Sequence, residues 1–306
     1  MYFFYDFGDS WQVSLTLEKV FTDNDLPGKE LPRVIEGGGF GIVEDVGGTG
    51  GLEELAKAFH KMNDIKQLAA LIRQSKNTVF FGGAGVSTES GIPDFRSETG
   101  LYTAKNVYGY SPEELLSHGL FKQKPELFFK YYRENLISKD AKPNAAHMAL
   151  AKIEKCGQLQ AVITQNIDGL HQAAGSKTVY ELHGSNLRQY CIDCGKKYTL
   201  DYILDDSHLN GGVIPICEKC GGTVRPDVVL YEEELDPLVI KSAVQKIESA
   251  ELLIVGGTSL AVYPAAGLLR YFCGKNLVLI NKSETPYDHA AQLVIHDSIG
   301  KVFLQL

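Results

Sequence analysis

The sequence predicts an α/β fold with a Rossmann-like, doubly wound parallel sheet, a smaller second domain, and a short segment appended at the N-terminus. After about residue 62, short apolar runs alternate with helical patterns, as in parallel strands covered on both faces. Two stretches, 101–142 and 189–224, interrupt this alternation. Eight glycines within residues 35–51 indicate a loop or linker that separates the beginning of the chain from the rest.

The first part, residues 1–61, is interpreted as an acidic, glycine-rich appended segment. Residues 11–21 alternate apolar and polar side chains, which is typical of a half-buried strand. Residues 52–72 carry apolar side chains at helical spacing and predict one amphipathic helix or a pair of helices. We place the domain boundary near Met62, so that residues 62–306 form the main domain.

The main domain contains five apolar runs that predict the strands of the sheet. Helical patterns between them cover residues 145–155 and 236–249. The aromatic-rich stretch 101–142 and the polar, cysteine-bearing stretch 189–224 should pack together as the smaller domain. The predicted strands are residues 78–81, 161–164, 179–182, 251–255 and 277–280.

Composition and charge exclude several classes of protein. With 44% hydrophobic and 22% charged residues, the 306-residue chain has the composition of a globular protein rather than a disordered one. Of the net charge of −8, residues 1–60 carry −7 and the remainder only −1, so no basic footprint for direct nucleic-acid binding is present. We see no membrane span and no signal peptide, and expect a cytoplasmic protein.

The first predicted strand ends in the sequence GGAGVSTESGIPDFRS. Glycines let backbone N–H groups approach a phosphate closely, and a following helix start would add its positive dipole end. A tight turn without a ligand explains the glycines equally well, since the third glycine of the usual dinucleotide fingerprint is missing. Asp94, Phe95 and Arg96 add an anion, an aromatic face and a bidentate cation, which favours a binding site.

Two further strands end in polar residues. Gln165, Asn166 and Asp168 follow one strand, and amide and carboxylate groups there could bind a carboxamide and a ribose hydroxyl. His183 follows the next strand, and the pKa of histidine suits a general base. His171 is interpreted as a helix-surface or capping residue, and the other histidines as structural.

Two C-x-x-C pairs in the second excursion indicate a metal site. The pairs are separated by 22 residues, and four thiolates can surround a zinc ion without leaving a position for water. The site is therefore predicted to hold one structural zinc ion, with iron as the alternative. The predicted ligands are Cys191, Cys194, Cys217 and Cys220.

The last two strands also end in polar loops. Gly256, Gly257, Thr258 and Ser259 offer backbone amides and hydroxyls for phosphate, and Asn281 offers an amide for a ribose. Each loop alone is unremarkable. Together with the earlier loops, however, five strand ends converge on one crevice.

The ordered motifs GAGVSTESGIPDFRS, TQNIDGLH, ELHGS, two C-x-x-C pairs, GTSLAVYPAA and INKSETP resemble the sirtuin family of NAD-dependent protein-lysine deacylases over about residues 62–306. The resemblance implies a Rossmann-type domain, a zinc-bearing small domain, and a cleft for NAD and an acylated lysine. It makes Asn166, Asp168 and His183 catalytic, with His183 as the base. The implied NAD-binding residues are Gly83, Ala84, Gly85, Asp94, Phe95, Arg96, Gln165, Asn166, Asp168, Gly257, Thr258, Ser259 and Asn281.

The reaction implied by the resemblance needs no catalytic metal. The acyl oxygen of the substrate lysine attacks the ribose carbon as nicotinamide leaves, and His183 then takes a proton from a ribose hydroxyl, whose oxygen attacks the imidate carbon. The products are free lysine, nicotinamide and O-acyl-ADP-ribose. The partners would be acylated-lysine proteins or peptides; neither direct nucleic-acid binding nor a membrane is implied.

Sirtuins commonly pair a Phe-Gly-Glu stretch with the substrate peptide, and here Tyr231, Glu232 and Glu233 stand in its place, after Val229. Glu232 replaces the flexible glycine, which suggests a preference for basic flanking residues. The residues after Tyr102 lack the tyrosine and arginine pair linked to acidic acyl groups, so acetyl or longer apolar acyl groups are favoured.

Residues 1–61 resemble part of a family of uncharacterised plasmid-encoded bacterial proteins with a Tyr-Asp-Phe-Gly-Asp-Ser-Trp stretch. That resemblance implies no activity. Two alternatives to the deacylase remain: a protein mono-ADP-ribosyltransferase, and a non-catalytic NAD-sensing scaffold. A sensor has no use for a base at His183, and the transferase would act without an acyl substrate.

Overall fold

The computed structural model describes residues 2–4, 12–14, 49–93 and 104–306. Contacts between residues divide the chain into two compact units, 1–63 and 64–306. In the first unit, β1 (Tyr2–Phe4) pairs antiparallel with β2 (Gln12–Ser14). β2 falls within the predicted strand 11–21, and the other residues of that prediction lie outside the described part. The predicted boundary near Met62 remains a prediction, and one continuous helix, α1 (Thr49–Gln74), passes through it.

The centre of the second unit is a six-stranded sheet in the order β13-β12-β11-β3-β4-β5, with every neighbouring pair parallel. The predicted doubly wound sheet is therefore confirmed. Of its six strands, only β13 was not predicted. The strands are β3 (Thr78–Gly82), β4 (Leu159–Thr164), β5 (Val179–Glu181), β11 (Leu252–Gly256), β12 (Asn276–Ile280) and β13 (Leu293–Ile295).

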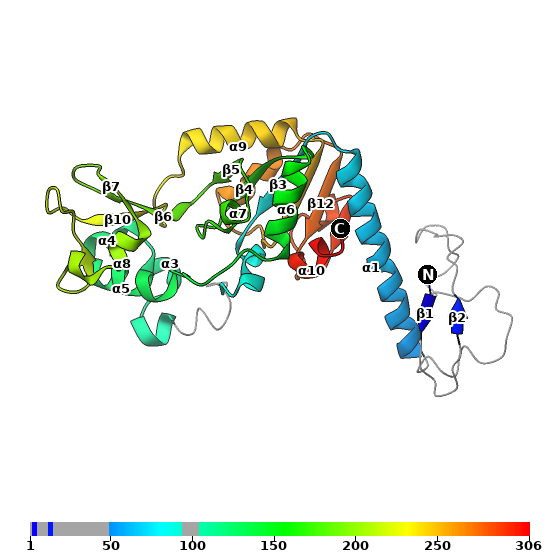
Figure 1. The fold of residues 1–306 in the computed structure, drawn as a ribbon, viewed down its shortest axis with the longest axis horizontal. Coiled ribbons are helices and arrows are strands. Elements are labelled where there is room, and N and C mark those ends of the chain that lie inside the picture. Colours follow the sequence, from blue (N-terminus) through cyan, green and yellow to red (C-terminus); the bar gives the residue numbers. More distant parts are fainter. Residues whose placement is uncertain (1, 5–11, 15–48, 94–103) are drawn as a thin grey trace. The chain divides into compact units, whose positions relative to one another are not determined.

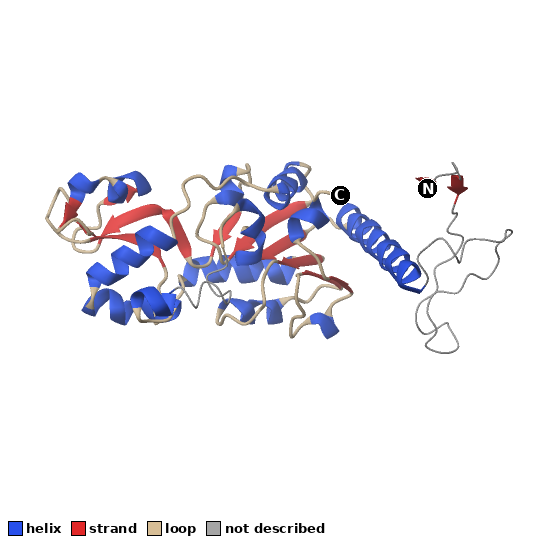
Figure 2. Cartoon of the chain, turned by 90° about the horizontal axis from the view of Figure 1, so that it is seen from below, coloured by secondary structure: helices blue, strands red, loops and turns tan. Residues whose placement is uncertain are grey.

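Helices lie on both sides of this sheet (Figure 2). Because successive side chains of a strand point to opposite faces, Phe80 packs with α1, α6 (Ala145–Lys155) and α10 (Ile299–Phe303). Val79 and Phe81 pack on the other face with α9 (Pro237–Ser249) and the 3-10 helix η4 (Ala265–Tyr271). Each of these three strand residues is fully buried, which explains why the strands have no polar alternation.

The smaller domain has a core of its own, built from both excursions (Figure 1). Its antiparallel sheet has the order β10-β6-β7, and aromatic side chains of α5, such as Phe128 and Phe129, are fully buried beside it. The bounds of this domain remain a prediction. Its elements are α3 (Pro112–Leu115), α4 (His118–Gln123), α5 (Pro125–Asn135), β6 (Gly184–Cys191), β7 (Lys197–Thr199), α8 (Leu200–Leu204), η3 (Asp206–His208), β8 (Leu209–Asn210), β9 (Ile214–Pro215) and β10 (Val224–Val228).

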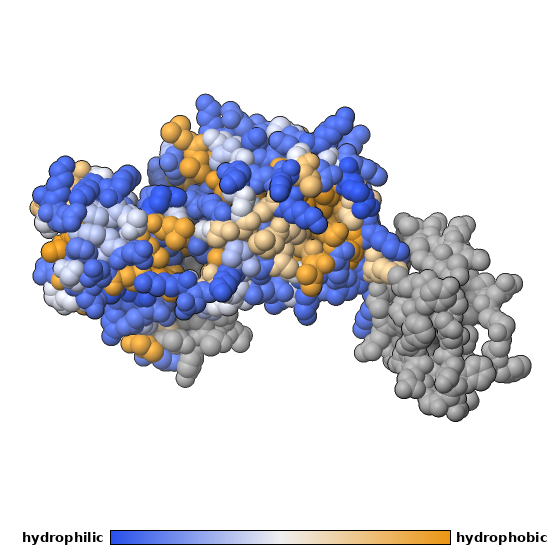
Figure 3. Space-filling view, viewed as in Figure 1, coloured by the Kyte–Doolittle hydropathy of each residue, from blue (hydrophilic) through white to orange (hydrophobic). Residues whose placement is uncertain are grey.

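The described surface is mixed in character. The face in Figure 3 is mostly hydrophilic, with hydrophobic residues gathered in several patches. Among the described residues, no helix combines the length and the apolar character needed to cross a bilayer. The remaining short elements are η1 (Ala84–Val86), η2 (Thr88–Ser90), α7 (Leu170–Ala173) and η5 (Asp288–Ala290).

Candidate active site

Two glycine-rich strand ends meet at the centre of the sheet. The N–H of Gly83 donates to the C=O of Gly256 over 3.3 Å, and the N–H of Gly85 donates to the C=O of Gly257 over 2.8 Å. A Cβ on Gly85 would lie 2.8 Å from the Cα of Gly257, so this approach requires glycine. Instead of the predicted helix, the two short 3-10 helices η1 and η2 follow β3. The strand order reverses here, which is where open α/β sheets bind ligands.

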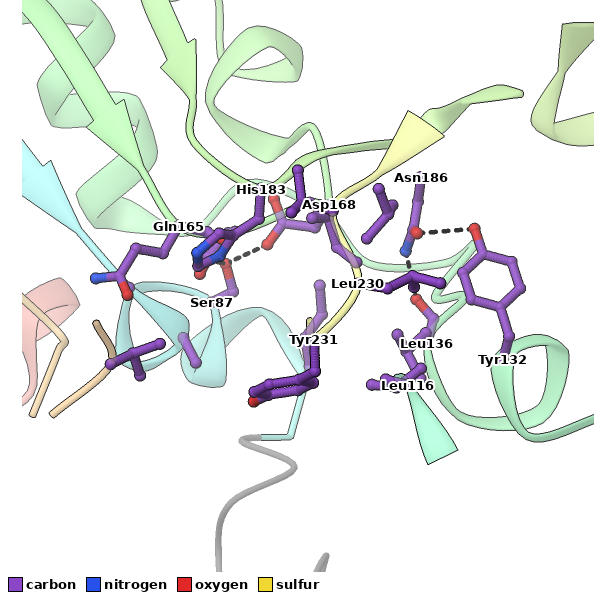
Figure 4. Close-up of a pocket in the computed structure, with 18 of the residues that line it drawn as sticks. Ser87, Leu116, Tyr132, Leu136, Gln165, Asp168, His183, Asn186, Leu230 and Tyr231 are labelled. Atoms are coloured by element: carbon purple, nitrogen blue, oxygen red, sulfur yellow. Dashed lines mark hydrogen bonds between the residues drawn. The ribbon is translucent and has the colours of Figure 1, made fainter. Parts of the chain in front are cut away.

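A buried serine joins two of the predicted site residues. Ser87, only 1% exposed, donates from Oγ to Asp168 Oδ2 over 2.7 Å and accepts from Asn166 Nδ2 over 3.0 Å. The other carboxylate oxygen of Asp168 accepts the backbone N–H of Leu170 over 2.9 Å. Ser87 therefore fixes the orientation of both polar side chains, and Figure 4 shows its bond to Asp168. Sequence reasoning did not single it out, although it lies directly after the glycine motif.

His183 is held at the end of β5 by groups from both domains. Its Nδ1 lies 2.9 Å from the C=O of Gln165, and its own C=O accepts the backbone N–H of Val229 over 3.0 Å. Because a carbonyl can only accept, Nδ1 must carry the proton, and Nε2 then holds the lone pair that a general base needs. The side chain of Gln165 points the other way and donates to Thr258 Oγ1 over 3.2 Å.

A cavity of about 710 Å³ lies where the two domains meet, and its walls bring most of the predicted site residues together (Figure 4). A second cavity of about 240 Å³ adjoins it and shares Gly257, Thr258 and Ser259 as walls. Gly85 and Asn281 line the second cavity. The predicted residues lining the larger one are Gly83, Ala84, Gln165, Asn166, Asp168, His183, Val229, Tyr231, Glu232, Glu233, Gly257, Thr258 and Ser259.

Three predicted residues, Asp94, Phe95 and Arg96, lie outside the described part of the chain. The described residues on either side of them, Pro93 and Ala104, line the larger cavity. The described chain therefore ends and resumes at the wall of the site.

The segment after β10 runs along the cavity between the two domains. The N–H of Tyr231 donates to the C=O of Leu116 over 3.0 Å, and its C=O accepts from the N–H of His118 over 2.9 Å. Both backbone groups of Tyr231, like the N–H of Val229, are therefore already used within the chain. At these positions a ligand would meet the remaining backbone groups and the side chains.

The two carboxylates that follow differ in their surroundings. Glu232 has a left-handed backbone with φ of 74°, and its exposed carboxylate accepts the N–H of Gly119 over 2.8 Å. Glu233 turns away and accepts two bonds from Arg225, at 2.6 and 3.0 Å. Burial alone would raise the pKa of the Glu233 carboxyl, but hydrogen bonds from Arg225, the Leu230 N–H and His118 outweigh burial and lower the pKa to about 2.

The four predicted metal ligands form one cluster in the smaller domain. All four sulfur atoms lie within 4.8 Å of one another, with Sγ–Sγ distances of 3.4 Å for Cys191 and Cys220 and 3.6 Å for Cys194 and Cys217. A disulfide requires about 2.0 Å, whereas a tetrahedron of sulfurs about 2.3 Å from zinc has edges of about 3.8 Å. The cluster therefore fits a structural zinc ion with four protein ligands.

A pair of buried histidines lies behind the site. His171 is 1% exposed and His147 is fully buried, and their ring centroids are 4.7 Å apart. His171 is thus a core residue, not the helix-surface residue that the sequence suggested. Burial lowers the pKa of His147 to about 4, although Asp168 partly offsets it, and burial together with His147 lowers that of His171 to about 3.

Known protein families match both parts of the chain. Residues 83–264 match the Sir2 family, and residues 1–78 match the Plasmid pRiA4b ORF-3-like protein family. The second match agrees with the resemblance noted for the N-terminal segment.

Curated relatives and solved structures resemble the larger part of the chain. The NAD-dependent protein deacetylase of Clostridium acetobutylicum is 62% identical over 79% of this chain and 96% of its own. That of Staphylococcus aureus is 48% identical over 80% and 98%. Among solved structures, a Sir2–p53 peptide–NAD+ complex is 39% identical with a TM-score of 0.69. Sir2Tm bound to a propionylated peptide is 38% identical with a TM-score of 0.70. Each match covers 79% of this chain and 96% of the solved chain. The chain therefore belongs to the Sir2 family.

Proposed function

We propose that this protein is an NAD-dependent protein-lysine deacylase, which transfers the acyl group of a modified lysine to ADP-ribose. One observation carries the proposal: His183, in the tautomer of a base, shares a cavity with Asn166, Asp168 and the glycine-rich strand ends. Close relatives are named NAD-dependent protein deacetylases. Solved structures of the family contain NAD+ or acetylated and propionylated peptides.

The two adjoining cavities suit an extended dinucleotide. The N–H groups of Gly83, Gly85 and Gly257 are bonded within the chain, so the phosphates would be bound by backbone amides and hydroxyls next to these glycines, such as those of Thr258 and Ser259. Asn281, in the smaller cavity, would bind a ribose. Gln165, Asn166 and Asp168 would bind the nicotinamide and its ribose at the other end. Ala84, Thr258 and Ser259 complete the proposed site, as do Asp94, Phe95 and Arg96 beyond the described residues.

The mechanism that fits these positions uses His183 as a general base. Bound NAD supplies an electrophilic ribose carbon, which the acyl oxygen attacks while nicotinamide leaves. His183 Nε2 would then accept a proton from a ribose hydroxyl, whose oxygen attacks the acyl carbon. The lysine amine would leave from that carbon and a water molecule would add to it, which gives free lysine and O-acyl-ADP-ribose. The Gln165 carbonyl keeps the other ring nitrogen protonated and stabilises the imidazolium that forms. Asn166 and Asp168, oriented by Ser87, position the sugar.

The acyl-lysine would enter beside Val229, Tyr231, Glu232 and Glu233. Beyond His183 the cavity is walled by apolar side chains of the smaller domain. Two polar residues that also line it are hydrogen-bonded to each other, since Tyr132 donates to Asn186 over 2.8 Å. Such a wall favours acetyl or longer apolar acyl groups over acidic ones. These apolar side chains are Leu116, Leu136, Ile137, Leu200 and Leu230.

Glu232 would act on the peptide rather than on the acyl group. Its exposed carboxylate lies at the rim of the cavity, so it would favour substrates with basic residues near the modified lysine. The cytosolic location and the absence of nucleic-acid binding remain predictions.

Mass spectrometry of one lysine peptide carrying different acyl groups, with and without NAD, tests the proposal. We expect loss of the acyl group only with NAD, together with free nicotinamide and O-acyl-ADP-ribose, and no turnover by His183→Ala. Transfer of ADP-ribose to protein without an acyl substrate would instead indicate the transferase. Binding of NAD without any product would indicate the sensor.

A further inference from the structure

The chain crosses from the large to the small domain at His183. β5 ends at Glu181 in the large sheet, and β6 begins at Gly184 in the small domain. Gly184 has φ of 78°, and a Cβ there would collide with the carbonyl oxygen of Asp227 on β10. The crossing segment is therefore packed, backbone to backbone, against the strand that leads to the proposed substrate segment.

One side chain bridges the strands on either side of this crossing. Arg188, on β6, donates from Nη1 to Glu181 over 2.7 Å and from Nε to Asp227 over 2.9 Å. Glu181 is well placed for this, since its side chain is only 10% exposed and its other oxygen accepts from Gln172 over 2.8 Å. Arg188 thus links a strand of the large sheet to a strand of the small one.

The bridge lies beside the hydrogen bond that holds the proposed base. Glu181 is two residues before His183, and Asp227 is two residues before Val229. His183 and Val229 are joined by the hydrogen bond from the Val229 N–H to the His183 carbonyl. Holding Glu181 and Asp227 on one guanidinium therefore also fixes the spacing of the His183 and Val229 backbones.

We propose that Arg188 is a positioning residue of the deacylation reaction, an inference that rests on the function proposed above. Arg188 does not line the cavity and so would not touch substrate. It would align the base with the bound peptide by joining the strands that carry them. Its side chain is 51% exposed, so the two ion pairs contribute little to stability. Alignment is the more sensitive property, because a shift of about 1 Å can slow an enzyme about a hundredfold.

The test compares two steps of the reaction in Arg188→Ala. In the proposed mechanism, nicotinamide leaves before His183 acts, so exchange of labelled nicotinamide into NAD does not need the base. We expect kcat for deacylation to fall about tenfold, while exchange and the KM for NAD stay within about twofold of the wild type. Arg188→Lys should recover part of the rate, since one ammonium group can reach only one carboxylate at a time.

Two further variants keep the result interpretable. Asp227→Ala removes one of the two carboxylates that Arg188 binds, and should slow deacylation in the same direction as Arg188→Ala. Arg133→Ala is the matched control, because Arg133 pairs with Asp206 over 3.0 Å within the small domain and should leave both rates unchanged. Melting temperatures of all variants should stay close to that of the wild type.

Unchanged deacylation in Arg188→Ala, in a wild-type enzyme that is active, would overturn the inference and leave the proposed function intact. An equal loss of exchange and deacylation would also overturn it, because a general structural defect slows both. If the wild type itself shows no NAD-dependent deacylation, the proposed function fails first.

Discussion

The buried pair His147 and His171 should make stability fall as the pH drops below about 6.5. An unfolded histidine has a pKa near 6.5, whereas burial lowers the pKa values in the folded protein to about 4 and about 3. Between these values the unfolded chain binds more protons than the folded chain. Acid therefore favours unfolding, and stability is fully present only above the unfolded pKa.

The size of the effect follows from the two pKa differences. Each histidine lowers the free energy of unfolding by about 1.4 kcal/mol per pH unit in this window, so the pair contributes about 4 kcal/mol between about pH 7 and pH 5. In His171→Leu one titrating group is removed. Leucine has a similar volume, and the two ring nitrogens that it replaces have no hydrogen-bond partner among the described residues. The contribution should then fall to about 2 kcal/mol.

Urea unfolding curves at several pH values measure this directly. The difference between wild type and His171→Leu isolates the contribution of His171, because His147 and carboxyl groups such as Glu233, with its pKa lowered to about 2, titrate in both proteins. His289→Leu serves as the control, since His289 is exposed. Equal pH dependence in the wild type and His171→Leu would refute the burial argument.

Three other substitutions have definite expected results. Ser87→Ala should lower kcat/KM about ten- to a hundredfold in the peptide assay with little change in melting temperature, since it removes a hydrogen bond to a carboxylate worth about 1.5–3 kcal/mol. Glu232→Gly should match or exceed the wild-type melting temperature, because relief of about 1 kcal/mol of left-handed strain offsets the lost bond to Gly119, whereas Glu232→Ala should melt lower. Cys217→Ser should lose zinc by elemental analysis and melt at a lower temperature, whereas Cys156→Ser, outside the cluster, should retain the metal.

Periodicity predicted the sheet well because its central strands are buried on both faces and so are nearly continuous apolar runs. β13, an edge strand of three residues, was missed, whereas the equally short edge strand β5 was predicted. The start and end of helix α6, Ala145 and Lys155, agree with the sequence. Asn144 explains that start, because its side chain accepts the N–H groups of residues 146 and 147 as an N-cap.

Sequence patterns located strand ends but not the contacts between side chains there. They indicated that Asn166 and Asp168 would converge with the glycine loop, yet the linking Ser87 became visible only in three dimensions. The outcome for His171 has the same cause: a short helix after a glycine at φ of 74° turns the ring into the core, and no local pattern encodes that direction.

The site combines groups at the edge of the large sheet with groups whose positions depend on the crossing between the domains. Gln165 directly follows β4 of the large sheet and orients the imidazole of His183, while Val229 directly follows β10 of the smaller sheet and holds the His183 backbone. β6 begins directly after His183, carries Arg188, and ends at the metal ligand Cys191, which pairs with Val224 of β10. A zinc ion that keeps β6 and β10 in register would therefore influence catalysis through the strands themselves, without touching the substrate. The small domain would then do more than enclose the cleft: it would set the distance between a bound peptide and the proposed base.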